Sequence, residues 1–302
     1  MEKLYPCLSI CIVSYNTRDL LRDCLVSLQS YAVRCPYEVI VVDNHSEDGT
    51  VEMLRSEFCW VNLICNQDNL GYTVPMNQAL RAAHASQYIV QLNPDTVILE
   101  STFNNLIVFM ESHPSVGICT PKVLNRDGTL QKQCRRSAAR PWDTLAYFLH
   151  LGMLFPKNKL LNGYLMSYRG EDETHPVEAV SGSCMFIRRE VLAQVGYLDE
   201  QFFAYQEDSD FCFRARQAGW GIYYVPDSQI IHYGGQGGSM VNIEKSILEW
   251  HLSYYRYYHK NLARDYFFLI NWGFYSLMFL KMGLALLINR LRRRSYVGSP
   301  KP

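Results

Sequence analysis

The sequence predicts an α/β fold with a mostly parallel central sheet, helices on both faces of that sheet, and a helical C-terminal extension. Short apolar runs alternate with helical patterns from the N-terminus onward, and a polar loop follows each of the first four runs. Near the C-terminus lies an apolar stretch long enough for a membrane-associated helix. Strands that alternate with helices favour right-handed crossovers and parallel strands.

The composition fits a globular protein. The chain has 302 residues, of which 48% are apolar, enough to build a full core. Its 29 basic and 29 acidic residues balance, so no nucleic-acid partner is indicated. Ten scattered cysteines, with no Cys-x-x-Cys pair, favour reduced thiols in the cytosol. The first residues do not resemble a signal peptide.

The first half of the chain is predicted to repeat a strand, loop and helix unit. Hydrophobic periodicity places helices over 20–28, 51–58 and 76–83 between these strands, and a further helix over 101–112 after them. The predicted strands are the apolar runs 8–13, 38–42, 61–65 and 88–92.

The loops after these four strands should meet at one edge of the sheet, where α/β proteins bind ligands. Their candidate site residues are Ser14, Tyr15 and Asn16, then Asp43, then Asn69 and Gly71, and finally Asp95. Neither a Gly-x-Gly-x-x-Gly pattern nor a P-loop is present. A simple turn is the alternative for Asp95 in Asn-Pro-Asp, and a turn or helix cap is the alternative for Asp43.

The second half contains further strands at 116–120 and 180–187, the latter entered through small residues that include Gly182. Asp127-Gly128 predicts a hairpin turn. Acidic residues then gather at the start of a helical pattern, where Glu207 and Asp208 are adjacent. Capping that helix would need only one acid, so a functional role is favoured. His232 follows a strand, and a structural role is its alternative.

Several of these motifs together resemble the family 2 glycosyltransferases of GT-A fold, especially their rhamnosyltransferase-like branch. The similarity covers about residues 8 to 235. It implies a catalytic domain over 1–240, with a nucleotide-binding half of about 1–125 and an acceptor half of about 126–240, followed by a helical, apolar and basic tail over 241–302. The motifs are Ile12-Val13-Ser14-Tyr15-Asn16, Val41-Val42-Asp43-Asn44 with Ser46-x-Asp48-Gly49-Thr50, Asn69-Leu70-Gly71-Tyr72, Leu92-Asn93-Pro94-Asp95, and the run from Phe203 through Glu207-Asp208 to Gly219-Trp220.

The resemblance implies an inverting transfer of a sugar from a nucleotide diphosphate donor to a hydroxyl of a glycan or a polyprenyl-diphosphate-linked oligosaccharide in bacterial surface polysaccharide synthesis. L-Rhamnose from dTDP-rhamnose is the expected donor. Galactofuranosyl and other UDP-sugar transfer, or a catalytically silent nucleotide-binding membrane scaffold, are the alternatives.

Residue roles also follow from the resemblance. Asp208 resembles the catalytic base, and Asp43 the residue that holds the pyrimidine base. Asp95, with His232, would hold Mg²⁺ or Mn²⁺, although Asn93 replaces the first Asp of the family's Asp-x-Asp motif. The remaining predicted donor contacts are Ser14, Tyr15, Asn16, Asn69, Gly71 and Asn93, and the predicted acceptor contacts are Gly182, Glu207 and Trp220.

The segment 135–168 starts with arginines and continues with aromatic residues, without a clean strand pattern. We expect an inserted loop or helix that covers the acceptor side, with ordinary core packing or contact with lipid headgroups as alternatives.

The C-terminal region predicts a helix over 243–261 and an apolar helix over 266–289, which is followed by four arginines among residues 290–294. The apolar helix would be about 36 Å long at ~1.5 Å per residue, enough to span a bilayer. The positive-inside rule instead favours a surface or re-entrant helix on the inner, cytoplasmic face of the membrane. Packing on the domain, or a homo-oligomer interface, is the alternative.

Overall fold

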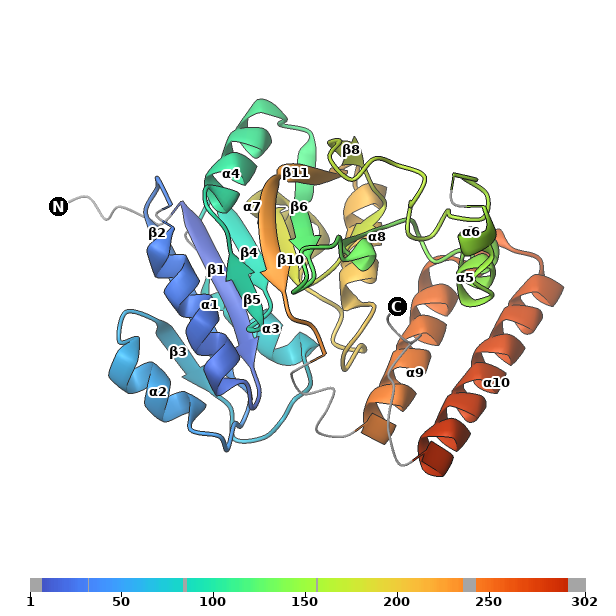
Figure 1. The fold of residues 1–302 in the computed structure, drawn as a ribbon, viewed down its shortest axis with the longest axis horizontal. Helices are drawn as coiled ribbons and strands as arrows, with labels where there is room; N and C mark the ends of the chain where they lie inside the picture. Colours follow the sequence, from blue (N-terminus) through green and yellow to red (C-terminus); the bar gives the residue numbers. More distant parts are fainter. Residues whose placement is uncertain (1–6, 32, 84–85, 156, 236–242, 293–302) are drawn as a thin grey trace.

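The computed structural model describes residues 7–31, 33–83, 86–155, 157–235 and 243–292. These form one large sheet covered by helices and a helical hairpin at one edge (Figure 1). The strands are β1 (Leu8–Ser14), β2 (Tyr37–Asp43), β3 (Asn62–Cys65), β4 (Tyr88–Leu92), β5 (Thr96–Ile98), β6 (Val116–Leu124), β7 (Arg135–Arg136), β8 (His175–Pro176), β9 (Ala179–Val180), β10 (Cys184–Arg188) and β11 (Gly221–His232).

Most helices follow the periodicity seen in the sequence, with ends that differ by a few residues from those predicted, whereas α5 and α6 lie in the segment 135–168, which showed no clear pattern. The helices are α1 (Arg18–Ser30), α2 (Thr50–Glu57), α3 (Thr73–Ala82), α4 (Thr102–Ser112), α5 (Pro141–Phe148), α6 (Leu151–Leu154), α7 (Arg189–Val195), α8 (Glu207–Gln217), α9 (Ile243–Asn261) and α10 (Phe268–Arg292), with short 3-10 turns η1 (Lys132–Cys134) and η3 (Ala263–Asp265).

The main sheet has the strand order β3-β2-β1-β4-β10-β6-β11-β5, with β8 paired to β11. Strands β3, β2, β1, β4, β6 and β11 run in one direction, while β10, β5 and β8 run against them. The mostly parallel sheet predicted from the sequence is therefore confirmed. The small strands β7 and β9 form a separate antiparallel pair.

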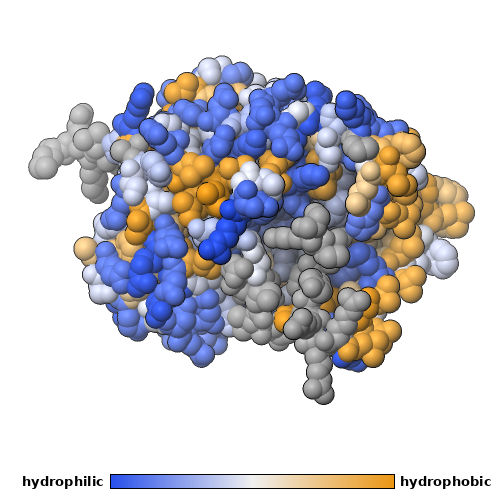
Figure 2. All heavy atoms as spheres, in the orientation of Figure 1, coloured by the Kyte–Doolittle hydropathy of each residue, from blue (hydrophilic) through white to orange (hydrophobic). Residues whose placement is uncertain are grey.

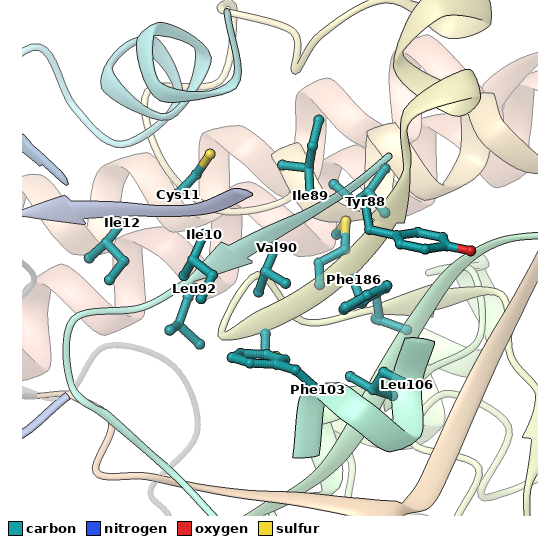
Figure 3. Packing of buried hydrophobic residues seen from close by; sticks show 14 of the residues in the cluster. Ile10, Cys11, Ile12, Tyr88, Ile89, Val90, Leu92, Phe103, Leu106 and Phe186 are labelled. Carbon is teal, nitrogen blue, oxygen red and sulfur yellow. The ribbon is translucent and has the colours of Figure 1, made fainter. Parts of the chain in front are cut away.

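Both faces of the central strands are buried. Helices α1 and α4 cover one face, and α3, α7 and α8 cover the other (Figure 1). Figure 3 shows Ile10 and Leu92 pointing toward Phe103 of α4, while Cys11 points to the opposite face. All four side chains are buried. Continuous apolar runs, rather than alternating ones, are typical of strands buried on two sides.

The C-terminal residues form an antiparallel hairpin of α9 and α10, which lies at the opposite edge of the molecule from β2 and β3 (Figure 1). A second buried cluster joins this hairpin to the segment around α5. The stretch Phe268–Leu291 is long and apolar enough to cross a membrane, and only 11% of its most apolar window is buried. The arginines predicted at 293 and 294 lie outside the described residues.

A smaller prediction, the hairpin turn, also holds. The backbone N–H of Asn125 donates to Thr129 O (2.8 Å), and Leu124 bridges Leu130, which confirms the hairpin turn at Asp127-Gly128. All ten cysteines lie within the described ranges as free thiols, and six of them are buried.

Candidate active site

A cavity of about 840 Å³ lies at the carboxyl ends of the parallel strands. The loops after β1 to β4 form one side of it, and the start of α8, α5 and α9 form the other. Asp95, in the loop after β4, and Asp208, at the start of α8, therefore both line this cavity. Nine of the predicted site residues line it, namely Tyr15, Asn69, Gly71, Asn93, Asp95, Gly182, Glu207, Asp208 and His232.

Asn44 organises the side of the cavity formed by the loops after β1 to β4, where the sequence predicts the donor. Its side-chain amide donates to Asn69 Oδ1 (2.9 Å) and to Gly71 O (2.7 Å), and its Oδ1 accepts from Leu70 N (3.1 Å). Asn44 is buried, so these bonds are shielded from water. The loops after β2 and β3 are thereby fixed to each other.

Gly71 holds the predicted donor side of the cavity against its predicted acceptor side. It has a φ of +84°, and a Cβ built there would lie 2.5 Å from Phe203 O. The next residue, Tyr72, donates its backbone N–H to the same carbonyl oxygen (2.7 Å). Only glycine permits both the left-handed backbone and this close approach. The loop after β3 is thus held against the segment that leads into Glu207 and Asp208.

Three predicted donor contacts lie beside the cavity rather than on its wall. Ser14 Oγ bonds Thr17 Oγ1 (2.9 Å), and Asn16 Oδ1 accepts from Glu47 N (2.8 Å), so both side chains hold loop structure. Asp43 Oδ2 caps a turn by accepting from Ser46 N (3.0 Å), which is the alternative considered for this residue. Its other oxygen, Oδ1, is buried and has no partner among the described residues.

Asp95 and His232 meet at the cavity floor. His232 belongs to the end of β11, which pairs with β5 directly after the Asn-Pro-Asp turn. Its Nε2 lies 3.1 Å from Asp95 Oδ1 and 3.2 Å from Asn93 Nδ2. Burial opposes ionisation of Asp95, but the contact with His232 and backbone N–H groups outweighs burial and lowers the pKa of this carboxyl.

The chemistry of these donors fits a divalent cation. Gln131 Oε1 lies 2.7 Å from His232 Nδ1, and a proton on Nδ1 would leave the lone pair of Nε2 for an ion. Nε2 and Asp95 Oδ1 lie 3.1 Å apart, so one small cation could contact both. Within the described ranges no three His, Cys, Asp or Glu side chains gather, so the remaining ligands would be substrate oxygens and water.

Asp208 is held rigidly at the start of α8. Its Oδ2 accepts from Arg136 Nη2 (2.7 Å) and from Gly182 N (3.1 Å), and its Oδ1 accepts from Ser209 N (2.6 Å). The side chains of Asp208 and Arg136 are each only 10% exposed, so the ion pair is buried. A buried, hydrogen-bonded pair fixes a carboxylate in one orientation.

Glu207 has a different environment, although it is the neighbouring residue. Burial, and then the charge of Asp208, raise the pKa of Glu207 to about 8. Its Oε2 is buried and has no hydrogen-bond partner among the described residues, as is true of Ser183 Oγ and Gln206 Oε1 beside it. All three residues line the cavity. Unpartnered polar atoms are costly when buried, so this wall is suited to a ligand rich in hydroxyl groups.

Trp220 does not belong to the site, and the prediction that it contacts an acceptor is wrong on this geometry. It directly precedes β11, whereas His232 at the cavity lies at the other end of that strand. Its indole Nε1 donates to Gln194 Oε1 (2.8 Å), and its ring packs beside Gly117. Strand direction explains the error, because residues that precede a parallel strand lie at the edge away from the ligand.

Sequence reasoning gave no role to three cavity residues that the structure makes prominent, Asn44, Gln131 and Arg136. Asn44 directly follows Asp43 at a strand end, which is a usable signal. Arg136 belongs to a two-residue strand in a segment whose fold no periodicity revealed, and its partner is 72 positions away. Buried arginines are rare without a partner, so a basic residue inside an apolar segment is the signal to examine.

Residues 6–264 match the sequence profile of the glycosyltransferase-like family 2. The chain belongs to this glycosyltransferase family. The enzyme is 29% identical over 238 residues to the N-acetylglucosaminyl-diphospho-decaprenol L-rhamnosyltransferase of Mycobacterium tuberculosis H37Rv, covering 75% of this chain and 76% of that one. It is 26% identical over 261 residues to the rhamnosyltransferase WbbL of Escherichia coli K12, covering 82% and 91%.

Solved structures support the GT-A fold of this glycosyltransferase. The mannosyltransferase PcManGT of Pyrobaculum calidifontis, solved in complex with GDP-Man and Mn²⁺, superposes with a TM-score of 0.57. The alignment covers 96% of this chain and 74% of that one at 18% identity, a level that supports the fold alone.

Proposed function

We propose that this glycosyltransferase transfers a sugar, most specifically L-rhamnose from dTDP-rhamnose, to a hydroxyl of a lipid-linked glycan with inversion at the anomeric carbon. The observation that carries the proposal is that Asp95 and Asp208, which are far apart in the sequence, line one cavity. A donor whose diphosphate lies near Asp95 would then place its sugar toward Asp208. The similarity to two rhamnosyltransferases supports the choice of sugar.

On the donor side, the unpartnered Asp43 Oδ1 is the group we assign to the N–H of the pyrimidine base. Tyr15 and Asn69 would contact the nucleotide from the loops after β1 and β3. Asp95 and His232 would hold Mg²⁺ or Mn²⁺, which supplies positive charge for the departing diphosphate.

On the acceptor side, Asp208 takes the proton of the attacking hydroxyl while the acceptor oxygen bonds to the anomeric carbon and the nucleoside diphosphate leaves from the opposite face. Arg136 and the Gly182 N–H direct one oxygen of Asp208, so the carboxylate needs no reorientation during attack. Glu207, protonated at neutral pH by its raised pKa, would donate a hydrogen bond to a sugar hydroxyl.

We place the enzyme on the cytoplasmic face of the membrane, with α10 on the bilayer and not through it. Helix α10 packs along α9, whose charged residues include Glu249 and Arg256. A spanning α10 that kept this packing would carry those charges into the hydrocarbon region at a cost of several kcal/mol. Surface placement leaves α9 and the catalytic domain in water.

The test is a transfer assay with purified full-length protein. It screens dTDP-rhamnose against UDP-galactofuranose and UDP-N-acetylglucosamine, each with Mg²⁺ and with chelator, on a short-chain polyprenyl-diphosphate N-acetylglucosamine. We expect turnover of dTDP-rhamnose only with metal, with the new glycosidic bond of opposite anomeric configuration to the donor. Transfer from another donor contradicts the assignment of rhamnose. Nucleotide binding without any turnover contradicts the enzyme and favours a silent scaffold.

A further inference from the structure

After α5 the chain forms an exposed apolar loop that contains α6. We call it the α6 loop (residues 149–155 and 157–160). Five of its large apolar side chains are between 58% and 74% exposed. Isolated exposed apolar residues are ordinary, but a contiguous group marks an interaction surface. The five are Leu149, Met153, Leu154, Phe155 and Leu160.

The charges of this loop have one sign. Lys157 and Lys159 are exposed beside the apolar side chains, and residues 149–160 contain no Asp or Glu. Helix α10 also contains no Asp or Glu. An apolar surface flanked by lysines is complementary to an anionic bilayer, whose lipids attract each cation by about 1 kcal/mol.

The loop is anchored to the hairpin of α9 and α10. Phe148, directly before it, lies with its ring 4.5 Å from Lys281 Nζ of α10, and the same ammonium lies 4.2 Å from the ring of Trp250 on α9. Outward-facing residues of α10 such as Leu280 (70% exposed) continue the apolar surface. Figure 2 shows apolar atoms gathered along this edge of the molecule, where Figure 1 places α6 and α10.

The same edge adjoins the acceptor side of the cavity. Tyr147 of α5 lines the cavity, while the next residue, Phe148, packs toward the C-terminal hairpin. Trp250 and Tyr254 of α9 complete this aromatic wall, and their rings are 4.4 Å apart. A single short helix therefore separates the cavity from the exposed apolar surface.

We propose that the α6 loop is a second membrane-inserting element, which enters an anionic bilayer together with the outer face of α10 and turns the acceptor side of the cavity toward the lipid. This inference rests on the proposed function and deepens it, because it names the surface from which a lipid-linked acceptor reaches Asp208. A second copy of the chain is a poorer occupant, because two such surfaces face to face would bring lysines against lysines.

The experiment is vesicle sedimentation of the full-length protein at limiting lipid. Vesicles of phosphatidylethanolamine and phosphatidylglycerol are compared with vesicles of phosphatidylcholine. We expect Leu154→Ser/Phe155→Ser to weaken binding to the anionic vesicles by about tenfold or more, since both side chains lose apolar burial. Lys157→Glu/Lys159→Glu should weaken it to a similar extent and leave the weaker binding to phosphatidylcholine unchanged. The matched control is Val26→Ser/Val108→Ser, which alters exposed apolar residues on α1 and α4.

Wild-type affinity in the Leu154→Ser/Phe155→Ser protein, while Leu280→Ser/Leu284→Ser on α10 abolishes binding, would overturn the role of the α6 loop. So would light scattering that finds a dimer which the loop variant dissociates. Donor turnover in detergent separates this inference from the proposed function. The loop variant should keep wild-type turnover there, whereas a wild-type protein that binds vesicles but turns over no donor contradicts only the proposed function.

Discussion

The two sides of the cavity are built in different ways. On the donor side, short loops after parallel strands are bonded to one another, with Asn44 as the shared partner. On the acceptor side, groups from distant segments meet, and the decisive contact joins Arg136 to Asp208 across 72 positions. The donor side is preorganised by local hydrogen bonds. The acceptor side combines Asp208, whose two carboxylate oxygens are hydrogen-bonded, with Glu207, which has a buried oxygen without a partner among the described residues. This difference suggests that the first side holds a fixed ligand and the second side carries the proton chemistry.

The largest expected effect is at Asp208, the hydrogen-bonded acid. Asp208→Asn should lower kcat by about a thousandfold, within the range found for loss of a general base, while nucleotide binding measured by calorimetry stays near wild type. Asp172→Asn, which alters a carboxylate whose side chain is 85% exposed, is the control. Near-wild-type transfer by Asp208→Asn would remove the base assignment and with it the contrast between the two sides.

The next effect tests the donor side. Asp95→Asn should lower kcat/KM by roughly a hundredfold, because the diphosphate loses several kcal/mol of charge stabilisation from its cation. Gln131→Ala alters only the partner of His232, and it should raise the metal concentration needed for half-maximal activity by about tenfold. Metal titration of activity measures both. Full activity of the wild type in the presence of chelator would show that Asp95 and His232 do not serve to bind a metal ion.

A third prediction concerns Glu207, the acid whose Oε2 has no hydrogen-bond partner among the described residues. Burial raises the pKa of Glu207 to about 8 from an ordinary value of 4.5, so the folded state binds more protons than the unfolded state between these pH values. The free energy of unfolding should therefore fall as pH rises through this window, by a total on the order of a few kcal/mol. Urea denaturation across the window should show the fall in the wild type.

Glu207→Gln should remove most of that pH dependence, because a neutral amide has no proton to lose. Glu47→Gln, at an exposed position, should keep it. An identical pH dependence in the wild type and in Glu207→Gln would mean that Glu207 is ionised in the folded protein, and that it accepts rather than donates a hydrogen bond in the cavity.

The same contrast explains what the sequence could and could not predict. Asn69 and Asp95 could be placed at the cavity because each follows a strand that its apolar pattern reveals, and parallel strands bring such loops together. Arg136 was missed because a two-residue strand has no periodicity, and its partner is fixed only by the tertiary fold. Local sequence patterns are enough to predict the donor side, whereas the acceptor side depends on contacts between segments far apart in the sequence.

Trp220 is the opposite case, in which a sequence motif suggested a contact that the fold does not make. It lies in the same run of residues as Glu207 and Asp208, yet α8 and a turn separate them, and the chain has crossed to the other edge of the sheet before β11 begins. Proximity in sequence to Glu207 and Asp208 therefore did not predict proximity to them in space.

The smallest expected effect follows from this position. Trp220→Phe should keep the packing beside Gly117 and lose the hydrogen bond to Gln194, which costs about 1 kcal/mol of unfolding free energy. Its kcat and its KM for the acceptor should stay within about twofold of wild type. Trp250→Phe is the matched comparison. Trp250 lines the cavity, so this substitution should raise the KM for the acceptor severalfold. If Trp220→Phe changed the acceptor KM and Trp250→Phe did not, the acceptor would bind at the other edge of the sheet, and the assignment of the two sides would have to be reversed.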